Sequence, residues 1–413
     1  MARNFLMADK IPEGWKKCKL GDAPFEIIDG DRGVNYPKQN EFKDDGYCLF
    51  LNAKNVTSNG FVFDDCYFIS KEKDQILRKG KLQRNDIILT TRGTVGNIGF
   101  FNDKIPYDNI RINSGMVIIR PNPDEILAEY TYQLFKNIKC EFNVFATGSA
   151  QPQLPIRDIK EISFSLPPLA EQRAIASVLS NLDDKIDLLQ RENQTLEQIA
   201  ETLFRQWFVE EASEWWEEKP LSFFGEIICG KTPSKKIEEY FGGDIPFIKI
   251  PDMYGNTFVF ETSDSLTEKG KNSQNNKTLL PRSICVSCIA TVGLVSMTTK
   301  ESQTNQQINS IIPKKVFYQY YLYLFMKNFS ELLIAMASGG TATLNLNTGD
   351  FSKIEVVLPD ENILKNFHNI VEPIFEKIFE NQRQIRTLEK LRDTLLPKLM
   401  SGEVRVTLTE EKA

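Results

Sequence analysis

Histidine is almost absent from this sequence: its 413 residues include only His368. Sites that need several imidazoles, such as His-rich zinc sites, are therefore excluded. A Ser-His-Asp or Cys-His site could be built only around that one residue. His368 lies in the helical pattern FHNIVEPIFEKI, where we expect a partly exposed helix residue rather than a catalytic one.

Long apolar runs are also missing. No stretch of about 18 apolar residues could span a membrane, and the opening MARNFLMADK lacks the apolar core of a secretory signal. The seven cysteines are an odd number and widely scattered, which is typical of reduced thiols in a cytoplasmic protein. The one C-x-x-C, from Cys285 to Cys288, lies in a strand-like run without a second pair, so we expect a structural role for it.

The sequence repeats itself after about 200 residues. FEIIDG (25–30) returns as GEIICG (225–230), and DIKEISFSLP (158–167) returns 192 residues later as DFSKIEVVLP (350–359). Each copy has short apolar runs bounded by turn residues, typical of strands, followed by one long helical pattern. The sequence therefore predicts an α+β fold of two tandem mixed domains, each followed by a long helix.

Both long helical patterns carry a narrow heptad seam. The first seam consists of Leu182, Ile186, Leu189, Asn193, Leu196, Ala200 and Leu203. The second consists of Ile374, Ile378, Asn381, Ile385, Leu388, Arg392 and Leu395. A helix that packs only on its own domain needs a wider apolar stripe, so we predict that the two helices pair with each other. The asparagine in each seam either fixes the register of the pair or is solvated at a frayed seam.

These patterns divide the chain into five segments. They are a first domain (12–168), a first helix (169–209), an acidic linker (210–219), a second domain (220–360) and a second helix (361–401). The net charge of −6 is concentrated on the first helix and linker, because residues 170–219 hold twelve acidic and five basic side chains. This segment favours protein partners over phosphate, although a solvated acidic face is the alternative.

GEIICGKT (225–232) matches the nucleotide-binding pattern G-x-x-x-x-G-K-[ST]. The counterpart of its last three residues in the first copy is Gly30-Asp31-Arg32, which lacks both the lysine and the hydroxyl. Pro233 also removes an amide where a phosphate-binding helix would begin. We interpret the match as accidental and expect no cofactor. A nucleotide-dependent enzyme stays open as an alternative, which ATP binding by the isolated chain would support.

Aromatic residues cluster on both helical patterns outside the seams. Phe375 and Phe379 form an i, i+4 pair, and Phe204, Trp207 and Phe208 lie where the first helix ends. Exposed apolar stripes of this size mark interfaces. For the helix-end cluster, packing against the neighbouring domain is the alternative.

Several segments together resemble one known family. The junction LPPLAEQRAI (166–175) resembles that in the specificity subunit of type I restriction–modification systems. Similar to other segments of that family are DGDRGVNYP (29–37), TRGTVG (91–96), GSAQPQL (148–154), GKTPSKK (230–236) and YFGGDIPFI (240–248). The resemblance covers the chain from about Pro12 to Arg405. The second copy departs from it, because LPDENIL (358–364) replaces LPPLAEQ, which puts the packing of the second junction in doubt.

The resemblance implies a non-catalytic protein. In that family two target-recognition domains each read half of a split sequence in double-stranded DNA, and two helices form an antiparallel coiled coil as a spacer. The subunit docks two methyltransferase (modification) subunits, and restriction subunits join through this methyltransferase core. A coiled-coil interaction protein without DNA specificity is the alternative of another class.

Contacts to DNA need side chains that donate to base edges and phosphates. Loops of the first domain offer Arg32, Tyr36, Lys38, Lys54, Asn55, Arg92, Thr94 and Asn97. Loops of the second domain offer Lys231, Ser234, Lys235, Lys249, Tyr254, Asn256, Asn305, Gln306 and Gln307. We expect DNA contacts from this set as a whole, although each residue taken singly is more often an ordinary surface residue.

Overall fold

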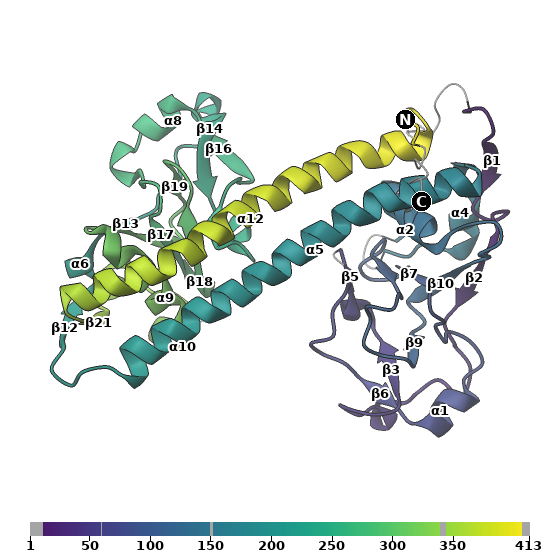
Figure 1. Cartoon of the computed structure of the whole chain (residues 1–413), viewed down its shortest axis with the longest axis horizontal. Coiled ribbons are helices and arrows are strands. Elements are labelled where there is room, and N and C mark those ends of the chain that lie inside the picture. Colours follow the sequence, from purple (N-terminus) through teal and green to yellow (C-terminus); the bar gives the residue numbers. More distant parts are fainter. Residues whose placement is uncertain (1–10, 59, 149–151, 339–343, 407–413) are drawn as a thin grey trace, which may run out of the picture. The chain divides into compact units, whose positions relative to one another are not determined.

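The structure is a computed structural model that describes residues 11–58, 60–148, 152–338 and 344–406 (Figure 1). It contains two compact units, the first formed by residues 1–185 with 388–413 and the second by residues 186–387. Residues 149–151 of the segment GSAQPQL lie outside the described residues. Among the helices of the described ranges, none has the length and apolar character needed to cross a bilayer.

The first unit holds the first set of strands and short helices. Its strands are β1 (Lys16–Lys19), β2 (Phe25–Asp29), β3 (Cys48–Leu51), β4 (Val56–Thr57), β5 (Gly60–Phe61), β6 (Phe68–Ile69), β7 (Ile87–Thr90), β8 (Ile98–Phe100), β9 (Ile110–Ile112), β10 (Met116–Pro121) and β11 (Ser163–Leu166). Its helices are η1 (Gln39–Glu41), η2 (Ala53–Asn55), α1 (Lys71–Ile76), α2 (Ala128–Asn137), α3 (Lys139–Phe145) and α4 (Ile156–Glu161). The long helix α5 (Leu169–Arg205) begins in this unit.

The second unit holds the remaining elements. Its strands are β12 (Glu217–Pro220), β13 (Gly225–Cys229), β14 (Phe241–Ile248), β15 (Phe258–Val259), β16 (Asp264–Leu266), β17 (Ile284–Ile289), β18 (Thr291–Thr298), β19 (Gln303–Thr304), β20 (Ile308–Pro313) and β21 (Glu355–Leu358). Its shorter helices are η3 (Gln206–Glu210), α6 (Leu221–Phe224), η4 (Glu238–Tyr240), α7 (Ile250–Met253), α8 (Glu268–Asn272), η5 (Asn275–Lys277), η6 (Val316–Tyr318), α9 (Gln319–Asn328), α10 (Ser330–Ala337) and α11 (Thr348–Ser352). The long helix α12 (Glu361–Ser401) begins here and ends in the first unit.

The two units share one sheet topology. The main sheet has the order β2-β10-β7-β8 in the first unit and β13-β20-β17-β18-β15 in the second. A smaller sheet has the order β6-β3-β9 in the first and β16-β14-β19 in the second, and one pair in each is parallel (β3 with β9, β14 with β19). The predicted α+β class with two tandem domains is confirmed.

The central strands are near-continuous apolar runs because both of their faces are buried. Along β10, Val117 and Ile119 pack in the core beneath α2, whereas Met116 and Ile118 pack in the core of the smaller sheet. This alternation follows from the two-residue period of a strand.

In the second unit, β17 contains both thiols of the C-x-x-C. Cys285 and Cys288 are buried there, and burial raises the pKa of Cys285 to about 12 and that of Cys288 to about 11. Buried thiols with raised pKa values are unreactive packing groups, in agreement with the structural role predicted for this pair.

Segments of α5 and α12 pair antiparallel in the first unit. The Asp183 carboxylate on α5 accepts a hydrogen bond from Arg392 Nη1 on α12 at 3.1 Å. Near the start of α5, Glu171 forms an ion pair at 2.7 Å with Arg405, which follows the end of α12. Residues nearer the start of α5 thus contact residues later in the sequence, which means that the two helices run antiparallel.

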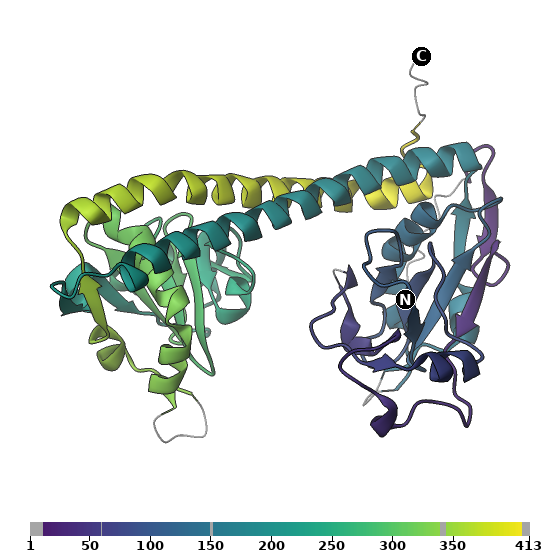
Figure 2. The same ribbon diagram turned by 60° about the horizontal axis from the view of Figure 1, so that its bottom comes forward.

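The same direction holds in the second unit. Asn193 on α5 contacts Asn381 on α12, and Phe204 contacts Phe367 with ring centroids 6.4 Å apart. Figures 1 and 2 show these parts of the two helices side by side over the second domain. The heptad seams therefore correctly indicated helix pairing.

The aromatic residues outside the seams pack within the second unit. Phe375 is fully buried and stacks on Tyr320 with centroids 4.4 Å apart, and Phe379 lies 5.2 Å from Phe258. The expectation that this pair forms an exposed interface stripe was wrong, because the second domain covers it. His368 is also buried rather than partly exposed.

The helix-end cluster packs against the neighbouring domain, which confirms the alternative given for it. Phe204 and Phe208 are buried, and both pack against Tyr321 on α9, with centroids 5.7 and 4.8 Å from it. The aromatic residues at the end of α5 and on η3 are thus part of the second domain's core.

Candidate nucleic-acid interface

Three loops meet at one edge of the main sheet in each unit. In the first unit Val117 pairs with Asp29 and Met116 with Thr90, so the ends of β2 and β7 lie beside the start of β10. In the second unit the pair Cys229 and Asn309 gives the same arrangement for β13 and β20. We call these segments the glycine turn (29–35 and 229–235), the asparagine turn (113–115 and 305–307) and the TVG loop (91–97 and 288–294), which in the second unit is the tight turn between β17 and β18 with the adjoining strand ends.

The asparagine turn has the same hydrogen bond in both units. Asn113 Oδ1 accepts the Gly115 N–H at 2.8 Å, and Asn305 Oδ1 accepts the Gln307 N–H at 3.1 Å. Such a bond from a side chain to the backbone two residues on stabilises a tight turn. The side-chain oxygen of Asn305, a predicted DNA contact, therefore accepts a hydrogen bond within the turn.

The glycine turn packs directly against the asparagine turn. A Cβ atom at Gly30 would lie 2.3 Å from the Asn113 carbonyl oxygen, and one at Gly230 would lie 2.1 Å from that of Asn305. Only glycine permits this approach of the two backbones. The glycines shared by the two sequence copies thus serve close packing.

The TVG loop completes the arrangement. The Thr91 N–H donates to the Gly115 carbonyl at 2.7 Å, and the Cys288 N–H donates to the Gln307 carbonyl at 2.8 Å. We call the three joined loops the recognition frame. The backbone of this frame is alike in both units, and the side chains that it carries differ.

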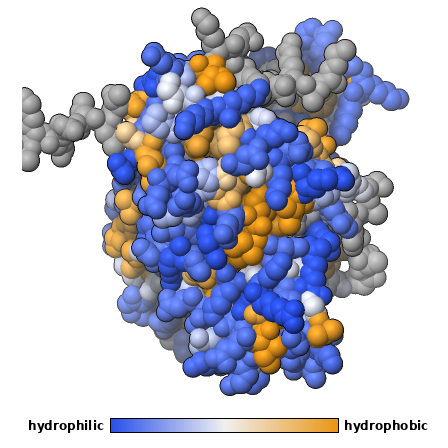
Figure 3. All heavy atoms as spheres, turned by 90° about the vertical axis from the view of Figure 1, so that its right-hand side faces the viewer, coloured by the Kyte–Doolittle hydropathy of each residue, from blue (hydrophilic) through white to orange (hydrophobic). Residues whose placement is uncertain are grey.

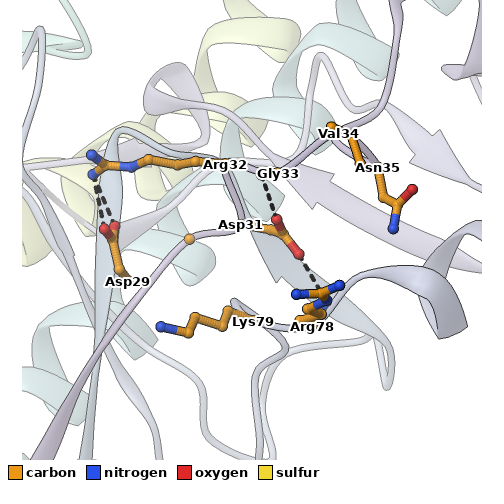
Figure 4. Close-up of a pocket in the computed structure, with 9 residues that line it drawn as sticks. Asp29, Asp31, Arg32, Gly33, Val34, Asn35, Arg78 and Lys79 are labelled. Atoms are coloured by element: carbon orange, nitrogen blue, oxygen red, sulfur yellow. Dashed lines mark hydrogen bonds and ion pairs between the residues drawn. The ribbon is translucent and has the colours of Figure 1, made fainter.

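In the first unit the frame presents a charged cluster around an open cavity of about 490 Å³ (Figure 4). Arg32 Nη2 donates to Asp29 at 3.0 Å and to the Ser114 carbonyl at 3.4 Å. Asp31 accepts the N–H groups of Gly33 and Arg78, both at 2.8 Å. The Gly33 bond is the main cause that lowers the pKa of Asp31, so this carboxylate is ionised at neutral pH.

In the second unit the segment 225–232, whose sequence matches the nucleotide-binding pattern, forms a strand and an extended turn. Thr232 Oγ1 donates to Gln306 Oε1 at 2.8 Å, and Gln274 Nε2 donates to the Lys231 carbonyl at 2.6 Å. Lys231 itself is exposed, as are Ser234 and Lys235. The turn leads to a short 3₁₀-helix at 238–240, whereas a phosphate-cradling loop leads into an α-helix.

Some predicted residues of the first unit are exposed at the frame and others lie outside it. Arg32, Arg92 and Thr94 are exposed on frame loops, and Lys38 and Lys54 are exposed beside η1 and on η2. All five side chains are open to solvent, and three of them share one site, so their contact with DNA stays a prediction.

The other predicted residues of the first unit are engaged within the fold. Asn55 is 2% exposed, and its Nδ2 donates to the Val62 carbonyl at 3.2 Å. Asn97 Nδ2 donates to the Val56 carbonyl at 2.9 Å. Tyr36 is half-buried, and this burial raises the pKa of its phenol. These side chains hold loops in place.

In the second unit, contacts within the fold also engage several predicted residues. Lys249 forms an ion pair with Asp264, and Asn256 Nδ2 donates to a backbone carbonyl at 3.1 Å. Tyr254 is exposed, and its hydroxyl lies 3.4 Å from Thr291 Oγ1 on the TVG loop. Gln306 is exposed and Gln307 half-buried on the asparagine turn.

Four residues at the first site were not predicted from the sequence: two belong to the frame and two lie beside it. Asn113 and Ser114 form its asparagine turn, and Arg78 and Lys79 line its cavity. Asn113 precedes Asn305 by the same 192 residues that relate other parts of the two copies, so the repeat could have revealed it. No motif or repeat in the sequence points to Arg78 and Lys79, because only the folding of the chain places them near Arg32.

Comparison with known proteins gives the family. Residues 12–198 and 213–390 match the family described as type I restriction modification DNA specificity domain. The chain belongs to this family. The resemblance drawn from the motifs is confirmed.

Two relatives match this DNA specificity chain over nearly their whole length. The type I restriction enzyme HindI specificity subunit of Haemophilus influenzae is 34% identical and covers 94% of this chain and 99% of its own. The type I restriction enzyme MjaIX specificity subunit of Methanocaldococcus jannaschii is 29% identical over 96% of this chain and 95% of its own. A solved S subunit of a type I restriction–modification system from M. genitalium shares the fold, with a TM-score of 0.59, 17% identity and coverage of 95% and 97%.

Proposed function

We propose that this chain is the specificity subunit of a type I restriction–modification complex, in which each recognition frame reads one half of a bipartite duplex target. The observation that carries the proposal is the duplicated frame. Its backbone contacts recur in both units, whereas the first frame presents Arg32 and Arg92 where the second presents Thr232 and Ile289. A constant backbone with variable donors is suited to reading two different sequences.

The target that follows is asymmetric. Arginine prefers guanine, and the amide of Gln306, which is exposed on the second frame, prefers adenine, because their donor patterns match those base edges in the major groove. The net charge of −6 does not oppose this role, since phosphate contacts depend on local rather than total charge. From the predicted set we propose the exposed members as DNA contacts and the engaged asparagines as supports.

The chain itself is proposed to be non-catalytic and to act in the cytoplasm with two methyltransferase subunits, through which restriction subunits join. Exposed apolar surface supports protein partners. Trp215, between acidic residues of the linker, is 90% exposed, and Val209 is 51% exposed. Figure 3, which views the right-hand side of Figure 1, shows a further patch of apolar side chains within a mainly hydrophilic surface.

A binding selection tests the proposal. The full chain, purified with the methyltransferase subunits of the same host, is mixed with a library of random duplexes, and bound DNA is sequenced. We expect two conserved blocks separated by unread positions. Equal recovery of all sequences would support a coiled-coil protein without DNA specificity instead.

Gel filtration of the chain with the methyltransferase subunits tests the partners. It should show a stable complex, and a chain that elutes as a monomer in their presence would contradict the partner assignment.

A further inference from the structure

The cavity at the first recognition frame is lined by three cations whose surroundings differ, Arg32 from the frame itself and Arg78 and Lys79 from the loop after α1. Arg32 is held by Asp29 and by the Ser114 carbonyl. The side chains of Arg78 and Lys79 are exposed, and within the described ranges neither forms an ion pair or a side-chain hydrogen bond. All three line the cavity of Figure 4.

The two carboxylates of the cavity are already occupied. Asp29 accepts the Arg32 guanidinium, and the two oxygens of Asp31 accept the N–H groups of Gly33 and Arg78. Three cations face two carboxylates, so the cluster keeps one net positive charge. That surplus lies on Arg78 and Lys79, because Asp29 neutralises Arg32.

We infer that Arg78 and Lys79 form a clamp for a DNA backbone phosphate, and that Arg32 beside them reads a guanine. This inference rests on the proposed function and assigns separate tasks within one site. A phosphate is bound by charge that no protein carboxylate has neutralised, and its binding releases counterions from the duplex. Base reading instead needs donors with a fixed orientation.

Arg32 meets the requirement for base reading. Its contacts with Asp29 and Ser114 use Nη2 and fix the plane of the guanidinium, and in the described part of the chain Nε and Nη1 have no acceptor. Nε and Nη1 lie on different edges of the guanidinium, so the fixed plane presents the free Nη1 hydrogens to one guanine acceptor, O6 or N7. Lysine cannot replace it there, because an ammonium group has no such plane.

Asp31 is the positioning residue that holds the clamp beside Arg32. Its bond to the Arg78 N–H joins the loop after α1 to the glycine turn. Because this bond uses the backbone of Arg78, alanine at that position keeps it. The side chain of the clamp can therefore be removed without cutting the link between the loops.

The test measures duplex binding by the full chain in complex with the methyltransferase subunits of its host. The probe is a random-sequence duplex of about 40 base pairs, and its affinity is measured across a series of KCl concentrations. Each phosphate contact adds about 0.9 to the slope of log affinity against log salt. We expect the Arg78→Ala/Lys79→Ala double variant to weaken binding to every sequence alike and to lower the slope by about 0.9, since the pair holds one phosphate. Inorganic phosphate at constant ionic strength should leave binding unchanged.

A matched control removes the same charge elsewhere in the unit. Lys16 and Lys17 are adjacent exposed cations on β1, which pairs with β11 next to the start of α5. The Lys16→Ala/Lys17→Ala variant should keep the wild-type slope. Equal slopes for both double variants would overturn the clamp, as would displacement of the duplex by inorganic phosphate, because the pair would then hold the free ion.

Arg32 is tested by selection from the random library. Arg32→Ala and Arg32→Lys should each lose one guanine from one block, by about tenfold or more in discrimination, while the second block stays intact. Arg32→Lys keeps the charge and should leave the salt slope unchanged, which separates geometry from charge. A retained guanine in both variants would overturn the assignment of Arg32. A wild-type complex that selects no sequence would instead refute the proposed function, and the salt slopes would still decide the clamp.

Discussion

Asn381 Nδ2 donates to Asn193 Oδ1 at 2.9 Å, between α12 and α5, and both side chains are less than a tenth exposed. Both residues lie on the predicted seams, and their burial favours a register-fixing role over a solvated one. Asn193→Leu should lower the free energy of unfolding by about 1–3 kcal/mol, because the Asn381 amide loses its buried partner and keeps only the bond to Glu192 Oε2. Urea unfolding measures the change, and Asn369→Leu, at an exposed position of α12, is the control.

The double variant Asn193→Leu/Asn381→Leu should regain most of that loss, since neither buried amide is left unpaired. Counted as a change in the free energy of unfolding, the coupling energy from the resulting double-mutant cycle is therefore expected to be positive and about 2–3 kcal/mol. Additive effects of the two substitutions would show that the pair does not act as a unit.

Asp183 makes the stability of the first unit depend on pH. Burial alone raises its pKa, but Lys136, Gln133 and Arg392 together hold it below the ordinary value of 3.8. A carboxyl with a lowered folded pKa stabilises the protein above its unfolded pKa, and this stabilisation is lost as pH falls through the folded value. Asp183→Asn should therefore be less stable than wild type at pH 7 by roughly 1–3 kcal/mol, and the difference should shrink below about pH 4.

Urea unfolding between pH 7 and pH 3 measures this difference. Asp184→Asn is the matched control, because the Asp184 side chain is 59% exposed and pairs only at the surface with Lys104. A gap between wild type and Asp183→Asn that stays constant down to pH 3 would contradict the ion-pair account.

Gly30 and Gly230 allow a separate test of each frame. Gly30→Ala should displace the first glycine turn and weaken reading of one block, and Gly230→Ala should do the same for the other block, because the new Cβ would meet a backbone carbonyl in each. Gly349→Ala, where the nearest atom is a side-chain oxygen 3.2 Å away, is the control. Library selection by each variant is the measurement, and loss of both blocks in one variant would argue against two independent frames.

The sequence was sufficient for the architecture because the architecture is repetitive. Asn193 and Asn381 fall on seams that the heptad period reveals, and β2 and β13 fall in segments that recur after 200 residues. Periodicity and repeats depend on spacing along the chain, which a sequence shows directly.

The site was predicted less completely, because it depends on burial and on contacts between distant segments. Asn55 and Arg92 look alike as polar loop residues, yet Asn55 is buried and bonded while Arg92 is exposed. Arg78 reaches the glycine turn through a hydrogen bond that spans 47 residues of sequence. Neither fact follows from local composition.

The paired helices are proposed to set the distance between the two DNA blocks. Two readers on one face of a duplex need half-sites about one helical turn apart. Four residues inserted after Lys185 and four after Thr387, at the bounds between the units, lengthen each helix by about 6 Å. The unread gap should widen by one to two base pairs, at about 3.4 Å each, with both blocks intact. Altered bases within a block would show that the helices do not set the spacing.

Methylome sequencing after exchange of the first recognition domain tests the central claim most directly. A host in which residues 12–168 are replaced by the corresponding segment of another specificity subunit is compared with hosts that carry the natural chain or lack it. The account predicts that loss of the chain abolishes methylation of one bipartite asymmetric motif, and that the exchange alters one block and leaves the other block unchanged. A motif that persists without the chain, or an exchange that alters both blocks or neither, would contradict it.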